Sequence, residues 1–404
     1  MNVSFFPHID SRLILLLFCL LFLCCLSLRA ESYQDFDNYQ GIYTSDEIAF
    51  KLNHYLVKDP ALAKQFLLTK EAFFLYATEE DSQAHRPEFT LALASRPTSE
   101  RPHSLPLPST LAGLKIAIDP GHFGGRYAKL EQRWIEMDRP DSNQASDSIS
   151  FNEGTLTLLT AKLLKNLLED AGAQVLLTKE TNGTGVYPED FFDWLGRLNS
   201  SKSPFELFKD YNRLDLLARA DKINAYKPDV TLIIHYNAHG GRDPITQQNI
   251  PQPYNYNMVF VGGSFCRNEL SDFKSRYAFL HLLLTQTMDR SIALSEAILK
   301  EFVKQLNVPA VEEADPVPYL KNACINISKG VYARNLALTR LVHSPLCYGE
   351  SLCQDNKQEC LRLNDKSLVL EGIQGPERVK QVAMAYFKGL QAFTRNQAEQ
   401  IQLR

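Results

Sequence analysis

The amino-acid sequence predicts an α/β fold, in which a mainly parallel or mixed sheet is flanked by helices on both faces and preceded by a small, mostly helical N-terminal domain. From about Leu111, short apolar runs alternate with segments whose leucines recur at helical spacing. Strands that alternate with helices in this way are typical of a sheet covered by helices. Two of the apolar runs also end in a histidine, at the position where open α/β sheets place their ligands.

The composition restricts the class of protein and of partner. Hydrophobic residues make up 45% and charged residues 22% of the 404 residues, which is ordinary for a globular protein. The formal net charge of -4 provides no basic stripe, so we expect no nucleic-acid partner. The net charge also gives no general attraction for an anionic polymer, so local groups would have to bind one.

The first 30 residues read as a signal peptide. Leu13–Leu28 is almost wholly apolar, follows Arg12, and precedes Arg29-Ala30-Glu31, which predicts cleavage near Ala30. The run has about 16 residues, whereas a helix that spans a bilayer needs roughly 20. This favours cleavage over the alternative, an uncleaved membrane anchor. We therefore expect an exported protein without a stable membrane span.

The cysteines leave the redox state open. Five remain after the predicted signal peptide: Cys266, Cys324, Cys347, Cys353 and Cys360. An exported protein can form disulfides, and an odd count leaves at least one thiol free. A disulfide between Cys353 and Cys360 and a set of buried free thiols are both open.

Residues 31–95 form a distinct N-terminal unit that is rich in Tyr, Phe and Leu. Ser45–Tyr76 has mostly helical spacing, with Ser45 as the expected N-cap. The unit carries no catalytic constellation, and its role is open. The proline-rich residues 96–110 read as a semi-extended linker to a second domain, residues 111–404.

Local signals predict the elements of the second domain. Lys115–Ile118 is an apolar strand that Asp-Pro-Gly stops, because Pro and Gly end a strand and force a turn. Glu153–Asp170 carries leucines at helical spacing and ends at Ala171-Gly172. By the same criteria we expect strands over Gln174–Thr178, Val230–Ile234, Asn257–Val261 and Pro345–Glu350, and helices over Asn212–Tyr226, Ser291–Leu306, Ala333–Leu341 and Pro376–Thr394. Three long polar inserts, residues 123–150, 182–211 and 240–270, are expected as loops, and loops of this length are usually functional or mobile.

Four side chains are expected to meet at one edge of the sheet. His122 and His235 each follow the carboxyl end of an apolar strand, Glu153 opens a helix, and Glu350 ends a later strand. Two histidines and one glutamate fit a catalytic zinc site, which has three protein ligands and an open position for water. Zinc lowers the pKa of that water, and a nearby carboxylate can take its proton and pass it to the leaving group.

The order of the motifs around these residues resembles the zinc-dependent N-acetylmuramoyl-L-alanine amidases, which are peptidoglycan hydrolases. The resemblance covers roughly residues 112–395. It rests on Asp-Pro-Gly-His122-Phe-Gly-Gly, Asn-Glu153, Arg219-Ala-Asp-Lys-Ile-Asn, His235-Tyr-Asn-Ala and Tyr-Gly-Glu350-Ser. It implies a mixed sheet flanked by helices, one Zn²⁺ ion on His122, Glu153 and His235, and Glu350 as the catalytic acid-base. The implied reaction cuts the amide between N-acetylmuramic acid and the L-alanine of the stem peptide.

The sequence departs from the family pattern at several points. The segment between His122 and Glu153 is longer than usual, so Glu131 and Glu136 inside it are alternative ligands. Glu153 is preferred because a helix fixes a ligand better than a loop does. Gly154 replaces the usual basic residue after the glutamate, Lys179 replaces an arginine, and Ser351-Leu follows Glu350 in place of an apolar-aromatic residue and an Asn.

Other polar and aromatic residues were assigned lesser roles. His239 is expected at the rim of the pocket, Asp119 in a turn or beside the ligands, and Arg219 on the sheet face. His343 could assist Glu350 or lie on the surface. The aromatic residues of the inserts that could stack on substrate are Tyr127, Trp134, Tyr254 and Tyr256.

The sequence therefore supports three hypotheses of function. The first is an exported zinc amidase, periplasmic or associated with the cell wall, with peptidoglycan as its substrate and room for a protein activator. The second keeps the zinc and makes the protein a cell-wall peptidase. The third is a catalytically silent wall-binding protein. A further hypothesis, prompted by the length of the third insert, is that an element between His235 and Glu350, made of this insert and the helix-like Arg276–Thr287, inhibits the site by covering it.

Overall fold

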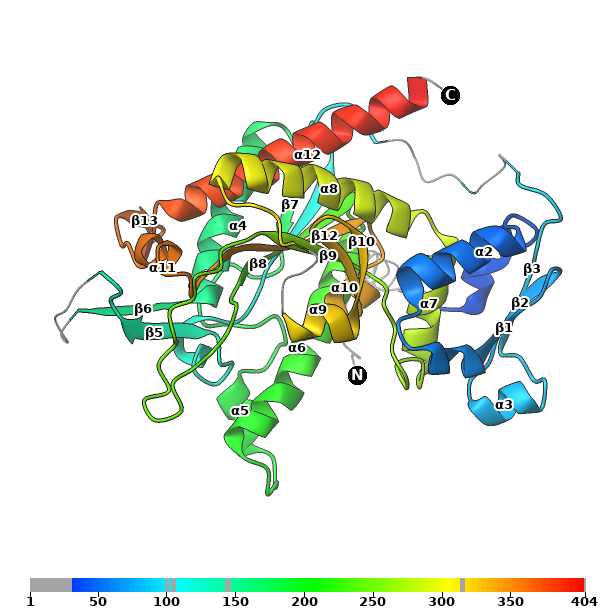
Figure 1. Ribbon diagram of the computed structural model, residues 1–404, viewed down its shortest axis with the longest axis horizontal. Coiled ribbons are helices and arrows are strands. Elements are labelled where there is room, and N and C mark those ends of the chain that lie inside the picture. Colours follow the sequence, from blue (N-terminus) through cyan, green and yellow to red (C-terminus); the bar gives the residue numbers. More distant parts are fainter. Residues whose placement is uncertain (1–30, 99–101, 103–106, 142–146, 313–316, 403–404) are drawn as a thin grey trace, which may run out of the picture.

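The computed structural model describes residues 31–98, 102, 107–141, 147–312 and 317–402. Helices cover both faces of a central sheet, and a smaller group of elements from the N-terminal part lies beside it (Figure 1). The predicted signal peptide and part of the predicted linker lie outside the described residues. Among the described helices, none is long and apolar enough to cross a membrane.

The central sheet is mixed, as predicted. Within the described residues it has seven strands in the order β10-β11-β9-β12-β8-β4-β7. The strands are β4 Lys115–Pro120, β7 Gln174–Leu177, β8 Val230–Asn237, β9 Met258–Val261, β10 Cys324–Ser328, β11 Val331–Arg334 and β12 Leu346–Cys353. β4 pairs in parallel with β7 and β8, β8 with β12, and β9 with β11. The pairs β9–β12 and β10–β11 are antiparallel.

Two apolar cores lie on opposite faces of this sheet, because successive side chains of a strand point to opposite sides. In β4, Ile116 and Ile118 belong to one core and Ala117 to the other. The first core takes the buried faces of α4 Glu153–Asp170, α8 Thr287–Leu306 and α12 Arg378–Gln402. The second core takes those of α6 Pro204–Tyr226 and α10 Ala337–Leu341. Both faces are covered, which explains why all eight residues of β8 are buried.

The predicted elements are confirmed with shifts of boundary, and one is wrong in part. α4 has the predicted bounds, with Asn152 as its N-cap. β8 continues through His235 to Asn237, and β12 continues through Glu350 to Cys353. The predicted helix Ala333–Leu341 begins too early, because Val331–Arg334 is the strand β11 and only Ala337–Leu341 is helical. Pairing with β9 and β10 satisfies the backbone of β11 and outweighs the local helical pattern.

All three inserts predicted as loops contain regular structure, and residues 240–270 include the predicted strand β9. Residues 123–150 include the 3-10 turn Gly125–Tyr127 and a hairpin of β5 Trp134–Asp138 and β6 Ser148–Asn152. Residues 182–211 include α5 Phe191–Gly196 and the start of α6, which Ser203 caps by accepting a hydrogen bond from the backbone N–H of Glu206. The remaining small elements are α9 Pro318–Ala323, α11 Glu359–Leu363, β13 Leu368–Leu370 and β14 Ile373–Gly375.

The N-terminal unit mixes short helices with a small sheet. Its elements are η1 Tyr33–Tyr39, α2 Ser45–Lys51, η2 Leu52–Leu56, η3 Pro60–Gln65, β1 Phe66–Leu68, β2 Ala72–Leu75, α3 Glu79–Gln83 and β3 Phe89–Ala92. The helical spacing read over Ser45–Tyr76 is wrong for β1 and β2, which pair with each other and with β3. The N-cap of α2 is Thr44 and not Ser45, because the Thr44 side chain accepts from Glu47 N and the Glu47 carboxylate accepts from Thr44 N.

The N-terminal unit shares one apolar core with α7 Phe273–Leu284. Phe36 and Phe73 of the unit are buried in the same cluster as Phe279 and Leu283 of α7. Tyr43 Oη donates a hydrogen bond of 2.6 Å to the carbonyl of Leu284 across this interface. Figure 1 shows α7 beside the N-terminal elements, far from the β5–β6 hairpin.

The five cysteines in the described part of the chain are free thiols. Four of them are buried, and Cys266 is partly exposed. Cys353 and Cys360 do not form a disulfide, so the alternative of buried free thiols is confirmed for these two residues.

Candidate metal centre

The loop after β4 delivers His122 to the carboxyl edge of the sheet. The backbone N–H of Gly121 donates to the carbonyl of Ile234 on β8 at 2.9 Å, so the loop stays against the neighbouring strand. His122 has a φ of 63°, in the left-handed region. Thr157 of α4 donates to the carbonyl of Gly121 at 2.6 Å. The histidine is therefore held on a turn that is fixed from both sides.

Three of the predicted site residues meet at this edge. One ligand atom from each of His122, Glu153 and His235 lies within 4.8 Å of the other two. Glu153 Oε1 is 3.2 Å from His122 Nε2 and 3.0 Å from His235 Nδ1. The two imidazole rings are nearly perpendicular, with centroids 4.6 Å apart. The structure thus brings together two ring nitrogens and one carboxylate from β4, β8 and α4.

The structure separates the two alternative glutamates from this cluster. Glu131 contacts the other nitrogen of His122, Nδ1, at 2.9 Å, and its second oxygen accepts from Phe123 N at 2.9 Å. It therefore orients His122 from behind and does not join the three converging atoms. Glu136 points elsewhere, accepting from Trp134 Nε1 at 3.2 Å.

The charges of the cluster suit a cation. Burial lowers the pKa of His122, but the carboxylates of Glu153 and Glu131 outweigh it and raise that pKa to about 9. Burial lowers the pKa of His235 to about 4, so this imidazole is neutral at pH 7. Burial opposes the ionisation of Glu153, yet His122 and His235 hold its pKa well below the usual range. At pH 7 the three candidate ligands together therefore carry one proton, on His122, and a bound metal ion would take the place of that proton.

Two glycines are required by the close packing around these side chains. A Cβ on Gly121 would lie 2.2 Å from the ring of His235, so only glycine lets that ring approach. A Cβ on Gly154 would lie 2.4 Å from the backbone nitrogen of Gly124. This explains why a glycine follows Glu153 in place of the usual basic residue: the start of α4 touches the loop that carries His122.

Glu350 lies beside the cluster, on the neighbouring strand. In the parallel pairing of β12 with β8 it is the partner of His235. It lines the same cavity as the three converging residues, and that cavity has a volume of about 410 Å³. Burial and, next, the charge of Glu153 raise the pKa of Glu350 to about 8. A cation in the site would act in the opposite direction and favour its ionised form.

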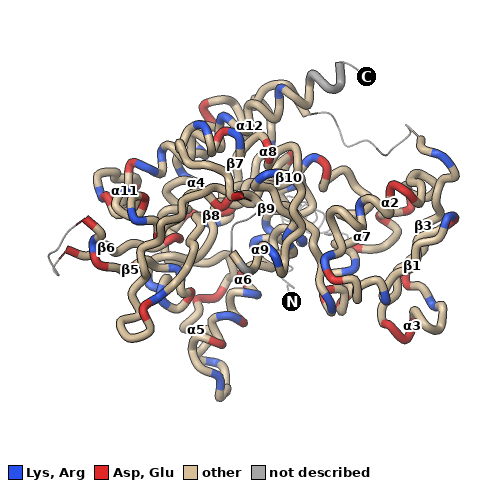
Figure 2. Tube along the Cα trace, in the orientation of Figure 1, with Lys and Arg blue, Asp and Glu red and all other residues tan. Residues whose placement is uncertain are grey.

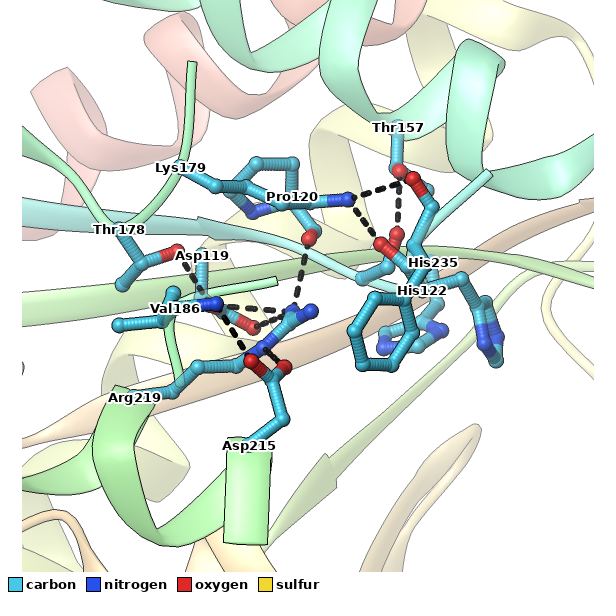
Figure 3. A network of polar contacts seen from close by, with 12 residues as sticks. Asp119, Pro120, His122, Thr157, Thr178, Lys179, Val186, Asp215, Arg219 and His235 are labelled. Carbon is cyan, nitrogen blue, oxygen red and sulfur yellow. Dashed lines mark hydrogen bonds and ion pairs between the residues drawn. The ribbon is translucent and has the colours of Figure 1, made fainter. Parts of the chain in front are cut away.

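A buried polar network supports the His122 loop from below (Figure 3). Arg219 donates to Asp215 at 2.6 Å and to the carbonyl of Pro120 at 3.0 Å, and lies 3.3 Å from Asp119. All of these side chains are almost fully buried. Lys179 donates to the carbonyls of His122 and Phe123. Arg219 and Asp119 therefore have the supporting roles expected for them, and Lys179 takes part as well.

The donor set fits a divalent metal ion. Two imidazole nitrogens and one carboxylate oxygen are the ligands of several catalytic zinc sites. The contact of Glu131 with the second nitrogen of His122 is the kind of support that metal-ligating histidines usually receive.

The model of the N-acetylmuramoyl-L-alanine amidase family matches residues 116–371, which is more than half of the chain. The chain belongs to this family. It is therefore an amidase, as the motifs around the site predicted.

Two solved amidase structures are similar to parts of the chain. One is the N-acetylmuramyl-L-alanine amidase Ami1 from Mycobacterium smegmatis, with 13% identity, a TM-score of 0.42, and coverage of 71% of this chain and 99% of that one. The other is the CwlD amidase from Clostridioides difficile in complex with the GerS lipoprotein, with 18% identity, a TM-score of 0.40, and coverage of 70% and 98%. No curated protein matches the chain.

Sequence reasoning missed several residues of the amidase cavity. Arg133, Arg242, Tyr319 and Arg334 line it, although they lie far apart in the chain. Arg133 directly precedes Trp134, and its carbonyl accepts from Glu153 N at 3.2 Å. Trp134, named as a stacking candidate, also lines the cavity.

Other expectations for amidase residues are corrected. Tyr127 is buried and donates to Asp190, so it cannot stack on substrate. Tyr256 is buried, whereas Tyr254 is exposed and stacks on His239 with ring centroids 4.2 Å apart. His343 precedes β12 and contacts Glu31 at 3.3 Å, at the opposite end of the strand from Glu350, so it cannot assist that residue.

One part of the segment proposed to inhibit the amidase site, residues 263–286, does not line the cavity. Residues 263–286 include α7, which packs against the N-terminal unit. Of the residues described, none in this segment lines the cavity. By contrast, Gly240, Gly241 and Arg242 of the third insert line the cavity, so inhibition by this insert stays a prediction.

Proposed function

We propose that this amidase binds one zinc ion through His122, Glu153 and His235 and hydrolyses the amide between N-acetylmuramic acid and the L-alanine of the stem peptide. The observation that carries the proposal is the convergence of these three side chains within 4.8 Å, beside Glu350, in a chain of the amidase family. Catalytic zinc sites use three protein ligands of this kind and leave a position for water or substrate.

Each residue has a distinct role in the proposed reaction. A bound zinc ion would polarise the scissile carbonyl and lower the pKa of water. Glu350 takes the proton of the attacking water and then delivers it to the nitrogen of L-alanine as the amine leaves. Glu131 holds His122 in one orientation through Nδ1, which leaves Nε2 facing Glu153. The buried Arg219 network keeps the loop of His122 in place.

The proposal extends to location and biological role. The signal-like residues 1–30 support export, and peptidoglycan as a substrate supports a periplasmic or wall-associated site of action in wall remodelling or cell separation. We also propose two features that the reaction itself does not require. One is the division of the chain into residues 31–95, 96–110 and 111–404, and the other is control by a protein activator. The N-terminal unit is the part of the chain whose contribution the reaction does not explain.

Glu350→Ala tests the role of the acid-base. We expect cleavage to fall by roughly 10²- to 10⁴-fold, since that is the usual contribution of a general acid-base, while one zinc ion per chain stays bound. Glu312→Ala is the matched control, because the Glu312 side chain is 68% exposed and lies away from the cavity. Full activity of Glu350→Ala would contradict the mechanism.

Mass spectrometry of digested peptidoglycan separates the proposal from its alternatives. An amidase releases intact stem peptides that begin with a free L-alanine amine. A cell-wall peptidase would leave shortened peptides attached to the sugar. Absence of both products together with absence of stoichiometric zinc would favour a silent wall-binding protein.

A further inference from the structure

Three arginines from separate parts of the chain face the catalytic cavity. Arg133 precedes β5, Arg242 lies in the insert after β8, and Arg334 ends β11. Arg242 and Arg334 are half-buried, and Arg133 is exposed. The protein as a whole is slightly acidic, and residues of both signs are scattered over the trace (Figure 2). The positive charge in this cavity is therefore a local feature.

The three arginines lack the carboxylate partners that the most deeply buried arginines of the chain have. Arg219, Arg276 and Arg378 are each almost fully buried and each lies within 2.7 Å of a carboxylate oxygen. By contrast, within the described part of the chain Arg133, Arg242 and Arg334 form no ion pair within 4.0 Å. Arg334 and Arg133 act on Glu350 only through their charges, which lower its pKa. Arg242 donates to the backbone carbonyls of Gln247 and Trp134. Partly buried arginines are usually paired, because taking an unpaired charge out of water is costly.

Aromatic rings hold two of these guanidinium groups in place. Arg334 lies over the rings of Tyr319 and Phe260, at 4.4 and 5.1 Å from their centroids. Arg242 lies 3.8 Å from the ring centroid of Trp134 and donates to the carbonyl of Trp134 at 3.1 Å. Stacking fixes the plane of a guanidinium without using its N–H groups. The guanidinium N–H groups of Arg334 make no hydrogen bond to any described residue and line the cavity, so they are available to a ligand.

The proximity of the two positive charges of Arg133 and Arg242 also favours a bound anion. Burial and, next, the charge of Arg133 lower the pKa of Arg242, and the charge of Glu136 offsets only part of this effect, so the two guanidinium groups repel each other. An anion between them would relieve this repulsion. Arginine is also the side chain best suited to bind a carboxylate with two parallel hydrogen bonds.

We propose that Arg133, Arg242 and Arg334 form an anion subsite in the catalytic cavity, which binds a carboxylate of the stem peptide close to the scissile amide, with Arg334 as its main contact. This inference rests on the proposed function, because it takes the stem peptide as the ligand. It makes the amidase selective for acidic stem peptides. The subsite also provides the local attraction that the net charge of -4 does not.

The test compares two muramoyl peptides that differ in one group. Their residue after L-alanine carries a carboxylate in one and a carboxamide in the other. Both are titrated by calorimetry into the zinc-loaded full chain with Glu350→Gln, which slows cleavage. We expect the carboxylate ligand to bind about 10- to 100-fold more tightly, the usual effect of a charge-assisted hydrogen bond. The preference should shrink at high salt, because screening weakens partly exposed charge pairs.

Variants of Arg334 locate the effect. Arg334→Met, added to Glu350→Gln, keeps the apolar stem and should remove most of the preference, whereas Arg334→Lys should retain part of it. Arg213→Ala is the control, because the Arg213 side chain is 79% exposed and does not line the cavity. Unchanged zinc content and melting temperature show that Arg334→Met is folded.

The outcomes also separate this inference from the proposed function. Equal affinity for the two ligands, binding of neither, or an undiminished preference in Arg334→Met would overturn the subsite. A clear preference in a protein whose wild type does not cleave the lactyl amide would leave the subsite standing and overturn the proposed reaction.

Discussion

At the scale of single residues, the orientation of His122 decides whether the site can bind metal. Its two ring nitrogens have different partners: Nδ1 contacts Glu131 at 2.9 Å, and Nε2 faces Glu153 at 3.2 Å. Losing the first contact would free the ring to rotate and would reduce the basicity of the second nitrogen.

Glu131→Gln tests this positioning role. We expect zinc affinity to fall by about 10- to 100-fold, the usual effect of removing such a partner, with the fold unchanged. Competition against a zinc-binding dye measures the affinity. Glu136→Gln is the matched control in the same insert, since Glu136 contacts Trp134 and not His122. Equal affinities of the two variants would contradict the role given to Glu131.

The protonation of His122 predicts how zinc binding depends on pH. With a pKa of about 9, metal-free His122 is protonated at pH 7, and zinc must displace that proton. For the His122 proton alone, as in Glu350→Gln, the apparent affinity should therefore rise about tenfold per pH unit up to pH ~9 and stay level above it. Calorimetry in buffers of different ionisation enthalpy counts the protons released.

Glu350→Gln is the matched control for this proton count. Glu350 has a pKa of about 8, and a bound cation would lower it. When zinc binds to the wild type, Glu350 can therefore release a second proton. In Glu350→Gln only the proton of His122 should leave. Release of no proton at pH 7 from this variant would show that His122 is neutral in the metal-free protein.

Sequence reasoning predicted that His122, Glu153 and His235 would lie together, because each follows or opens an element at the carboxyl edge of the sheet. That they bind zinc stays a prediction. Arg334 and Tyr319 could not be found in this way, because they reach the cavity through the pairing of β11 with β9 and through α9, which no local pattern encodes.

At the scale of elements, the start of α4 and the loop after β4 depend on each other. Gly154 and Gly124 approach so closely that an added Cβ on Gly154 would lie 2.4 Å from backbone. The position of Glu153 therefore depends on the absence of a side chain at the next residue.

Gly154→Ala tests this contact. We expect it to lower the free energy of unfolding by about 1–3 kcal/mol, as overpacking does, and to weaken zinc binding because Glu153 is displaced. Denaturant unfolding and a zinc titration measure the two effects. Gly196→Ala is the control, since nothing lies within 4 Å of a Cβ there. Unchanged zinc affinity in Gly154→Ala would show that the loop adapts.

Elements with a long periodic pattern could be predicted from the sequence, as α4 shows, whereas short ones could not. β11 was read as helix and β1 and β2 were assigned to a helical segment, because three or four residues carry too little pattern. Their strand state comes from partners distant in sequence, such as β9 for β11.

At the scale of the whole molecule, the N-terminal unit and the amidase part share a core. Phe73 of the unit is fully buried in the cluster that contains α7. Arg276 of α7 also pairs with Glu88 of the unit at 2.5 Å. The sequence predicted the unit but not this interface, because the interface depends on α7, which is distant in the chain.

Phe73→Ala tests whether the two parts unfold together. We expect a loss of about 3–5 kcal/mol in the free energy of unfolding, because the substitution leaves a cavity in the shared core, with a single transition that also releases zinc. Calorimetry with a zinc-release dye measures both. Phe50→Ala is the control, because Phe50 is 49% exposed. Two separate transitions, with zinc release unaffected by Phe73→Ala, would show that the parts are independent.

Reconstitution with zinc tests the central claim most directly. The metal-stripped protein is titrated with zinc while the release of stem peptides that begin with L-alanine is followed. We expect no release without zinc, a linear rise that stops at one equivalent, and no rise in His235→Ala. Release that is unaffected by stripping, or that returns in His235→Ala at one equivalent, would contradict it.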